Sequence, residues 1–320
     1  MKHTLINTHC LLILLSVVFM QYSCHQEKKE EKTDLREGNI VGKVKSIEEI
    51  TYRSKDTFGE IVKDSCAKVE NYLIEYNEEG NKTKQSSYDN AGLLYEQYTY
   101  IYNEKGKKIE ENRYGSDNNL YEQYTYVYNE KGKMTEKSKY GGNGALHYKF
   151  VILYDENGNR IERKRYNSAG ELFRKFTLAY DEHGNMIERK MYDSNGNLYD
   201  KYTYTYDEKG NNIEEYNYDS VGNLYERYTC TYNEKNNPLE WNCYGSTGNL
   251  LLKDNFVYDE KENILEQNGY GKDGIFEYHY SYTYIFDEQG NWINQIVFYK
   301  AVEEEKAKPI ILIQRNISYY

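Results

Sequence analysis

Glutamate and a basic residue recur together along much of the chain, and a row of carboxylates is one way to build an acid–base site. Paired carboxylates hydrolyse glycosides when one acts as the acid and the other as a nucleophile or base. Here each glutamate is followed 13 residues later by its own cation, so a row of salt bridges explains the pattern more simply, and the protein is not expected to be an enzyme. The pairs are Glu136 and Lys149, Glu162 and Lys175, Glu188 and Lys201, Glu214 and Arg227, and Glu240 and Lys253.

Two acidic stretches resemble calcium loops in their spacing. Asp155–Asn159 and Asp193–Asn197 both read Asp-x-Asn-Gly-Asn, but neither has the closing bidentate glutamate of an EF-hand. Hairpin turns account for them better. His147 and His279 stand alone at positions that other units give to aromatic residues, so no metal and no cofactor are expected.

Aromatic residues offer the strongest candidate for function. A tyrosine stands in the middle of each repeat described below, and a second ring lies diagonally across the following turn. Exposed rings in a row could stack on sugars or hold an extended peptide, although cross-strand ring pairs also stiffen a sheet. The candidate ligand-binding residues are Tyr114, Tyr121, Tyr192, Tyr199, Tyr218 and Tyr225.

These residues are positioned by a unit of 26 residues, seen in 102–127 as YNEKGKKIEENRYGSDNNLYEQYTYV. A partial ninth copy begins at Phe286. A strict period of this length is typical of repeat proteins, in which each unit buries its apolar face against its neighbours. The first residues of the eight complete units, here called the lead tyrosines, are Tyr76, Tyr102, Tyr128, Tyr154, Tyr180, Tyr206, Tyr232 and Tyr258.

Each unit carries two turn signals, one after the lead tyrosine and one after the mid-unit tyrosine. Asp207–Gly210 and Asp193–Gly196 are examples, with Asp first and Gly fourth, as type I turns prefer. The turns leave strands of roughly 8–10 residues, too short between turn signals for helices. The sequence therefore predicts an all-β fold of tandem antiparallel β-hairpins.

Alternation along the strands predicts two faces. Leucines such as Leu198, rings such as Tyr202 and isoleucines such as Ile187 are expected on an inner, apolar face. If the turns are symmetric and four residues long, Glu136 lies directly opposite Lys149, and the glutamates, cations and second tyrosine set share the outer face. A slip of one residue would exchange the faces.

An apolar face cannot stay exposed across so many strands, so the repeats are expected to form a long curled or spiral sheet. The expected parts are a signal peptide (1–23), a charged, mobile tether (24–37), an N-terminal β cap (38–75), the repeats (76–300) and closing strands (301–320). Cys230 and Cys243 flank one turn without standing opposite each other, so a disulfide there is open but not favoured.

The first residues predict a membrane anchor. A basic start precedes the apolar stretch Leu11–Met20, and Ser23-Cys24 follows. This resembles a bacterial lipoprotein signal, which implies lipidation at Cys24, and the charged residues after it resemble a surface-export tether. The expected location is the bacterial outer membrane, at the cell surface or on its periplasmic face. The net charge of −11 argues against nucleic-acid partners.

The stretch Tyr202–Asn211, YTYTYDEKGN, resembles the YD repeats of RHS-type bacterial proteins. The resemblance covers about residues 76–300 and implies β-hairpin strips, with carbohydrate binding or toxin encapsulation in some relatives. Most units lack the arginine that usually follows the turn glycine.

Taken together, the sequence predicts a surface lipoprotein that binds a glycan or a surface protein without catalysis. The alternatives are a purely structural assembly protein and, less favoured, a carbohydrate-active hydrolase.

Overall fold

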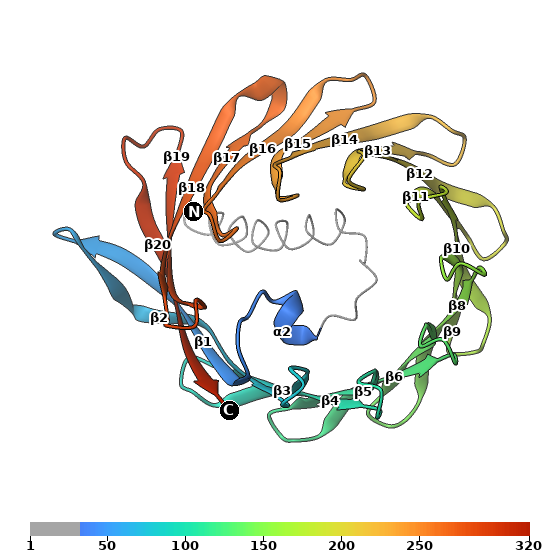
Figure 1. Ribbon diagram of the computed structural model, residues 1–320, viewed down its shortest axis with the longest axis horizontal. Helices are drawn as coiled ribbons and strands as arrows, with labels where there is room; N and C mark the ends of the chain where they lie inside the picture. The colour runs from blue at the N-terminus through green and yellow to red at the C-terminus, as the bar shows by residue number, and fades with distance from the viewer. Residues whose placement is uncertain (1–32) are drawn as a thin grey trace.

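The strands close into a complete ring in this computed structural model, which describes residues 33–320 apart from the side chains of residues 65–70. All 20 strands belong to one antiparallel sheet, and consecutive strands pair throughout. The last strand, β20 (Lys308–Tyr319), also pairs with the first, β1 (Val44–Thr57) (Figure 1). The all-β hairpin prediction is confirmed, whereas the spiral form of the sheet was wrong, because the pairing of the first and last strands closes the sheet into a barrel.

The other strands follow in chain order around the ring (Figure 1). They are β2 (Glu60–Tyr76), β3 (Lys82–Tyr88), β4 (Leu94–Tyr102), β5 (Lys108–Gly115), β6 (Leu120–Tyr128), β7 (Met134–Gly141), β8 (Leu146–Tyr154), β9 (Arg160–Asn167), β10 (Leu172–Tyr180), β11 (Met186–Tyr192), β12 (Leu198–Tyr206), β13 (Asn212–Tyr218), β14 (Leu224–Tyr232), β15 (Pro238–Gly245), β16 (Leu250–Tyr258), β17 (Ile264–Tyr270), β18 (Phe276–Phe286) and β19 (Trp292–Ala301), with the short 3-10 helix η1 (Lys272–Gly274) before β18.

The turns use the chemistry that the sequence indicates. In the turn after β11, the Asp193 carboxylate accepts the backbone N–H of Asn195 and of Asn197, at 2.9 Å each. Gly196 has φ +87°, in the left-handed region that glycine enters without strain. Asn236 and Glu262 stand in place of the turn glycine and still take positive φ, at 66° and 70°.

Each turn spans five residues rather than four, and a β-bulge follows it. Tyr140 pairs with Leu146, and after the bulge Glu136 pairs with Val151 instead of Lys149. The predicted register is therefore two residues out. Because two is even, the glutamates and cations still share a face, and Lys149 reaches Glu136 diagonally at 3.3 Å.

Because of the bulges, the leucines and isoleucines do not lie on the inner face that the sequence predicts. A bulge adds one residue to one strand, so side chains beyond it change face. Leu198 pairs with the mid-unit Tyr192, on the face that carries the glutamates and cations. Ile187 lies in the other bulge and is 40% exposed beside Glu188. Both apolar sets expected inside thus lie on the opposite face.

The face of the lead tyrosines lines the inside of the barrel. Helix α2 (Asp34–Glu37) lies within the ring (Figure 1), and the Tyr102 hydroxyl donates to Asp34 Oδ2 at 3.1 Å. The predicted tether therefore ends in a helical turn held by the wall. The Leu35 amide donates to the carbonyl of Gly80, in the first lead turn, at 3.1 Å.

The two rims of the barrel differ. At the rim of the lead turns, neighbouring turns touch: Asn211 Nδ2 donates to Asn236 Oδ1 at 3.0 Å, and Lys235 Nζ to the Glu260 carbonyl at 2.6 Å. At the mid-unit turns, the hairpin ends splay away from the centre of the ring (Figure 1). We call these the narrow rim and the wide rim.

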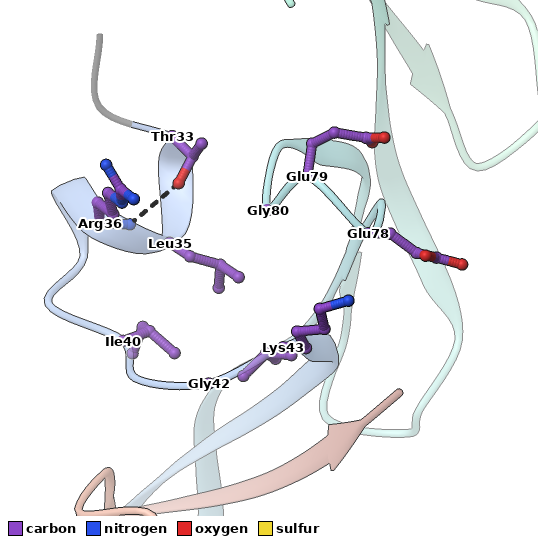
Figure 2. A pocket seen from close by; sticks show the side chains of 10 residues that line it. Thr33, Leu35, Arg36, Ile40, Gly42, Lys43, Glu78, Glu79 and Gly80 are labelled. Carbon is purple, nitrogen blue, oxygen red and sulfur yellow. Dashed lines mark hydrogen bonds between the residues drawn. The ribbon is translucent and has the colours of Figure 1, made fainter. Parts of the chain in front are cut away.

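An apolar cluster sits at the seam where the ring closes. It comprises Leu35, Val44, Ile47 and Tyr76, with Ile317 and Tyr319 packed against it. Figure 2 shows Leu35 directed toward the turn of Glu78–Gly80, with Ile40 beside it. Cys230 and Cys243 are buried and unbridged. Within the described residues, no helix has the length and apolar character needed to cross a membrane.

Candidate functional site

The mid-unit tyrosines lie on the outer face of the wall. Tyr192 pairs with Lys175 and Tyr218 with Lys201, and the Lys175 ammonium lies 4.5 Å from the centre of the Tyr192 ring. Tyr114 occupies the same place opposite Gln97. The Tyr192 and Tyr218 rings are therefore each contacted by a lysine across the strands, in the cross-strand pairing that stiffens a sheet.

The outer glutamate–cation row forms largely as predicted. The bridges Lys149–Glu136 (3.3 Å), Lys201–Glu188 (3.4 Å), Arg227–Glu214 (3.9 Å) and Lys253–Glu240 (2.6 Å) are present. Glu162 instead holds Lys164, at 2.7 Å. The carboxylates of this row are thus each engaged by cations, as salt-bridge partners rather than as a pair facing one another.

The second predicted set of rings lies inside, at the wide rim. Tyr121, Tyr199 and Tyr225 each occupy a β-bulge, which turns the ring toward the inner face. A Cβ on Gly115, whose strand partner Glu96 points inward, would overlap the Tyr121 ring. The Tyr199 ring centre lies 5.5 Å from the inner Arg174 guanidinium. The six candidate rings therefore do not form one row, because they divide between the two faces.

The inner set continues through six successive long strands, and we call it the rim row. Its members are Tyr95, Tyr121, His147, Phe173, Tyr199 and Tyr225 on β4, β6, β8, β10, β12 and β14. Its tyrosine and phenylalanine rings are exposed by 36–55%. Burial, followed by a hydrogen bond with Tyr202, raises the pKa of Tyr225, so this hydroxyl stays neutral and able to donate at ordinary pH.

Deeper in the wall, charged residues alternate with rings, and the sequence reasoning missed them. The residue nine after each lead tyrosine is Glu111, Lys137, Arg163, Arg189 or Glu215 in five successive units. Each stands between rings or aliphatic side chains on both neighbouring strands, as Lys137 does between Tyr126 and Phe150. The signal available was variability: this position changes charge from unit to unit while its neighbours stay constant.

A polar pocket opens beside α2 near the narrow rim. It is lined by Asp34, Lys82, Tyr100, Tyr102, Lys108 and Glu111. Glu111 accepts from Lys108 Nζ at 2.8 Å and from the Tyr126 hydroxyl at 3.0 Å. Asp34 accepts from the Lys82 amide at 2.7 Å. The Asp34 contact ties the N-terminal segment to the wall, whereas the Glu111 contacts lie within the wall.

Two further expectations concern single residues and metals. Cys24, the predicted lipidation site, lies outside the described residues. In the described part of the chain, no group of three or more His, Cys, Asp or Glu side chains is placed to hold a metal ion. The Asp155 and Asp193 carboxylates of the calcium-like stretches instead accept the amides of Asn159 and Asn197.

Comparison with known proteins gives structural likeness without sequence relatives. No family model and no curated protein matches the chain. A porin-like protein from Bacteroides uniformis is 11% identical, with a TM-score of 0.34, over 87% of this chain and 98% of that one. A porin-like protein from Bacteroides vulgatus is 11% identical, with a TM-score of 0.26 and the same coverage. The Tc holotoxin pore of Photorhabdus luminescens is 12% identical, with a TM-score of 0.37, over 74% of this chain and 16% of that one.

Proposed function

We propose that the protein is a lipid-anchored, non-catalytic surface module that binds glycans through the rim row at the wide mouth of its barrel. The observation that carries the proposal is the repeated exposure of rings at one level of the inner face. Tyr121, Phe173 and Tyr199 are exposed by 48%, 48% and 55%. Large exposed rings cost solvation free energy unless a ligand covers them.

The spacing of the rings suits an extended ligand. Successive members of the rim row stand two strands apart, and strands lie roughly 4.8 Å apart, so the rings recur about every 10 Å. That is the scale of a disaccharide. A glycan chain lying along the rim could place the apolar face of one sugar on each ring.

The outer face fits a barrel held beside the bilayer rather than within it. A lipid-facing barrel wall carries an apolar band about 25 Å tall. Here, Lys149, Lys201 and Lys253, with their glutamate partners, occupy the outer face. An anchor at Cys24 would supply the attachment, and metabolic labelling with a lipid precursor should fail in Cys24→Ser. Retained labelling would overturn the anchor.

The binding test compares the two sets of rings. The purified protein is applied to a glycan array, and the affinity for each bound glycan is then measured with two double variants. Tyr199→Ala/Tyr225→Ala removes two inner rings, and Tyr192→Ala/Tyr218→Ala removes two outer ones from the same region. Because a sugar stacks on the face of an aromatic ring, removing two rings should lower the glycan affinity of the inner variant at least tenfold.

The outer variant should bind within about twofold of the wild type. If no glycan binds the wild type, the glycan proposal fails, and co-purification of a protein partner would then favour an assembly role. Loss of binding in the outer variant alone would move the site to the outer face.

A further inference from the structure

In the described part of the chain, the inner cations without a carboxylate partner are concentrated on a few strands close together in the ring. They come from β7, β9, β10 and β11, and all lie on the face that carries the lead tyrosines. We call this group the basic sector, and it consists of Lys137, Arg163, Arg165, Arg174 and Arg189. A chain with a net charge of −11 thus presents a positive surface inside its barrel.

Rings, not carboxylates, contact these cations. The Arg163 guanidinium lies 3.8 Å from the centre of the Phe150 ring and 5.7 Å from that of Phe176. The Arg165 guanidinium lies 4.6 Å from the centre of the Tyr148 ring. Within the part of the chain whose side chains are described, no carboxylate comes within 4.0 Å of any member of the basic sector.

The remaining members show the same arrangement. Arg174 lies 5.6 Å from the ring centre of Phe173, in the rim row. The Arg189 guanidinium lies 4.1 Å from the centre of the Tyr202 ring. The Nε of Arg189 is buried without a hydrogen-bond partner. A buried donor without an acceptor is costly in a folded protein. A guanidinium stacked by its face also keeps its N–H edge free to bind an oxyanion with two parallel hydrogen bonds.

The local electrostatics are those of uncompensated positive charge. Burial lowers the pKa of Arg163, and Arg160 and Arg165 lower it further. Burial likewise lowers the pKa of Lys137, with Lys108, Arg163 and Lys139 adding to it against the opposing effect of Glu111. An anion seated among these groups would relieve both effects.

Carboxylates limit the basic sector on each side. Glu122 on β6 holds Lys139 at 2.6 Å. On the other side, Asp200 on β12 pairs with Met191 of β11, and Glu215 follows on β13. The positive surface is therefore a strip that runs from the middle of the wall up to the rim row, where Arg174 lies between Phe173 and Tyr199. A ligand on the rim row would meet these cations directly.

We infer that the basic sector selects an acidic glycan, one that bears carboxylate or sulfate groups, for the rim row to bind. This inference rests on the proposed glycan-binding function and adds the chemical class of the ligand. Rings would stack on the sugar faces, while the arginine edges would pair with the anionic groups.

The test uses the full chain with matched polymers. Dextran sulfate and polygalacturonate carry the anionic groups, dextran is the neutral counterpart, and inorganic sulfate, a DNA oligonucleotide and polyglutamate probe other anions. Titration calorimetry measures each affinity for the wild type, Arg163→Gln/Arg165→Gln and Lys164→Gln/Lys190→Gln. The lysine variant removes the same charge from β9 and β11, but from the outer face.

The wild type should bind an acidic polymer at least tenfold more tightly than dextran. The arginine variant should lose at least tenfold of that affinity, and the lysine variant should stay within twofold. Arg174→Gln, nearer the rim, should lose at least threefold and provides the test if the double variant does not fold.

Other outcomes separate this inference from the function on which it rests. Equal affinity for acidic and neutral glycans, dependent on Tyr199 and Tyr225 but not on the arginines, would keep the proposed function and overturn the basic sector. Arginine-dependent binding of DNA, polyglutamate or sulfate alone would overturn the ligand class. Equal losses in the arginine and lysine variants would mean a general charge effect and would also overturn it.

Discussion

The outer and inner faces of the same strand differ in whether their cations are paired with carboxylates. On β9, Lys164 points outward and its ammonium lies 2.7 Å from Glu162, whereas its neighbours Arg163 and Arg165 point inward onto rings. On β11, Lys190 is held by Glu188 at 2.6 Å, while Arg189 stacks on Tyr202. Charge on the outer face is neutralised within the chain, and charge on the inner basic sector is not.

The difference separates what builds the barrel from what distinguishes one part of it. Outer pairs such as Lys201–Glu188 and Lys253–Glu240 recur at one position of the unit, and each adds only a few tenths of a kcal/mol while opposing a wrong register. The inner position nine residues after the lead tyrosine changes from Glu111 to Arg163 to Glu215. The repeated face specifies the fold, and the varied face gives each sector its own chemistry.

The largest expected effect compares Asp254, which points inward, with its neighbour Lys253. Asp254 is 7% exposed and accepts from Gln267 Nε2 at 3.0 Å and from the Tyr278 hydroxyl at 2.7 Å. Asp254→Ala leaves those buried donors without this acceptor and should lower the free energy of unfolding by about 2–3 kcal/mol. Urea denaturation followed by circular dichroism measures the change.

Lys253→Ala is the matched control on the outer face. Its ammonium lies 2.6 Å from Glu240, and both side chains remain partly exposed, so the loss should be about 0.5 kcal/mol. If the two substitutions cost the same, the inner and outer faces would not differ in the way that the structure indicates.

A smaller effect is expected from the lead tyrosines, which tie successive units together. The Tyr206 hydroxyl donates to the Met186 carbonyl at 2.8 Å, and the equivalent bonds of Tyr154 and Tyr232 are 2.8 and 2.7 Å long. Tyr206→Phe removes one such bond and should cost about 1 kcal/mol in the same denaturation experiment.

The outer control here is Tyr218→Phe. That ring keeps its contact with the Lys201 ammonium, 5.5 Å from the ring centre, and the substitution removes only the hydroxyl. Its effect should stay within a few tenths of a kcal/mol. A loss near 1 kcal/mol in both variants would show that the lead tyrosines have no special part in joining the units.

Much of the wall could be predicted from the sequence because hairpin chemistry is local. Asp193 and Gly196 determine their turn through contacts within five residues, and the 26-residue period carries that turn through the chain. The bulges could not be predicted in the same way. They depend on how the five-residue turn meets strands that curve, and they moved Leu198 and Ile187 to the outer face.

The strand pairing that closes the ring and the candidate site escaped prediction for related reasons. The pairing of β20 with β1 joins residues such as Arg315 and Glu49, whose side chains meet at 2.7 Å across the seam, and no short-range pattern encodes so distant a contact. The rim row was found as a set of rings, but a bulge turned Tyr199 inward while Tyr192 stayed outside. Arg163 and Arg189 could not be identified from the repeat, because the position nine residues after the lead tyrosine differs from unit to unit.

The smallest expected effect separates the two faces by the sign of their pH dependence. Burial, opposed by Arg189, raises the pKa of the inner Glu215, whereas Lys253 and then Asn242 lower the pKa of the outer Glu240. The folded form therefore binds the Glu215 proton more tightly than the unfolded chain does, and the Glu240 proton less tightly. Each difference should amount to less than about 1 kcal/mol, and that of the partly exposed Glu240 to a few tenths.

The signs follow from this linkage. The contribution of Glu215 is fully present below the unfolded pKa of about 4.3 and is lost as the pH rises through the folded value. Glu215→Gln should therefore gain stability over the wild type as the pH rises above the unfolded pKa. The contribution of Glu240 is present above its unfolded pKa and is lost as the pH falls, so Glu240→Gln should be less stable at neutral pH and should match the wild type in acid. Urea denaturation at several pH values measures both curves, and two variants with the same sign would remove the electrostatic distinction between the faces.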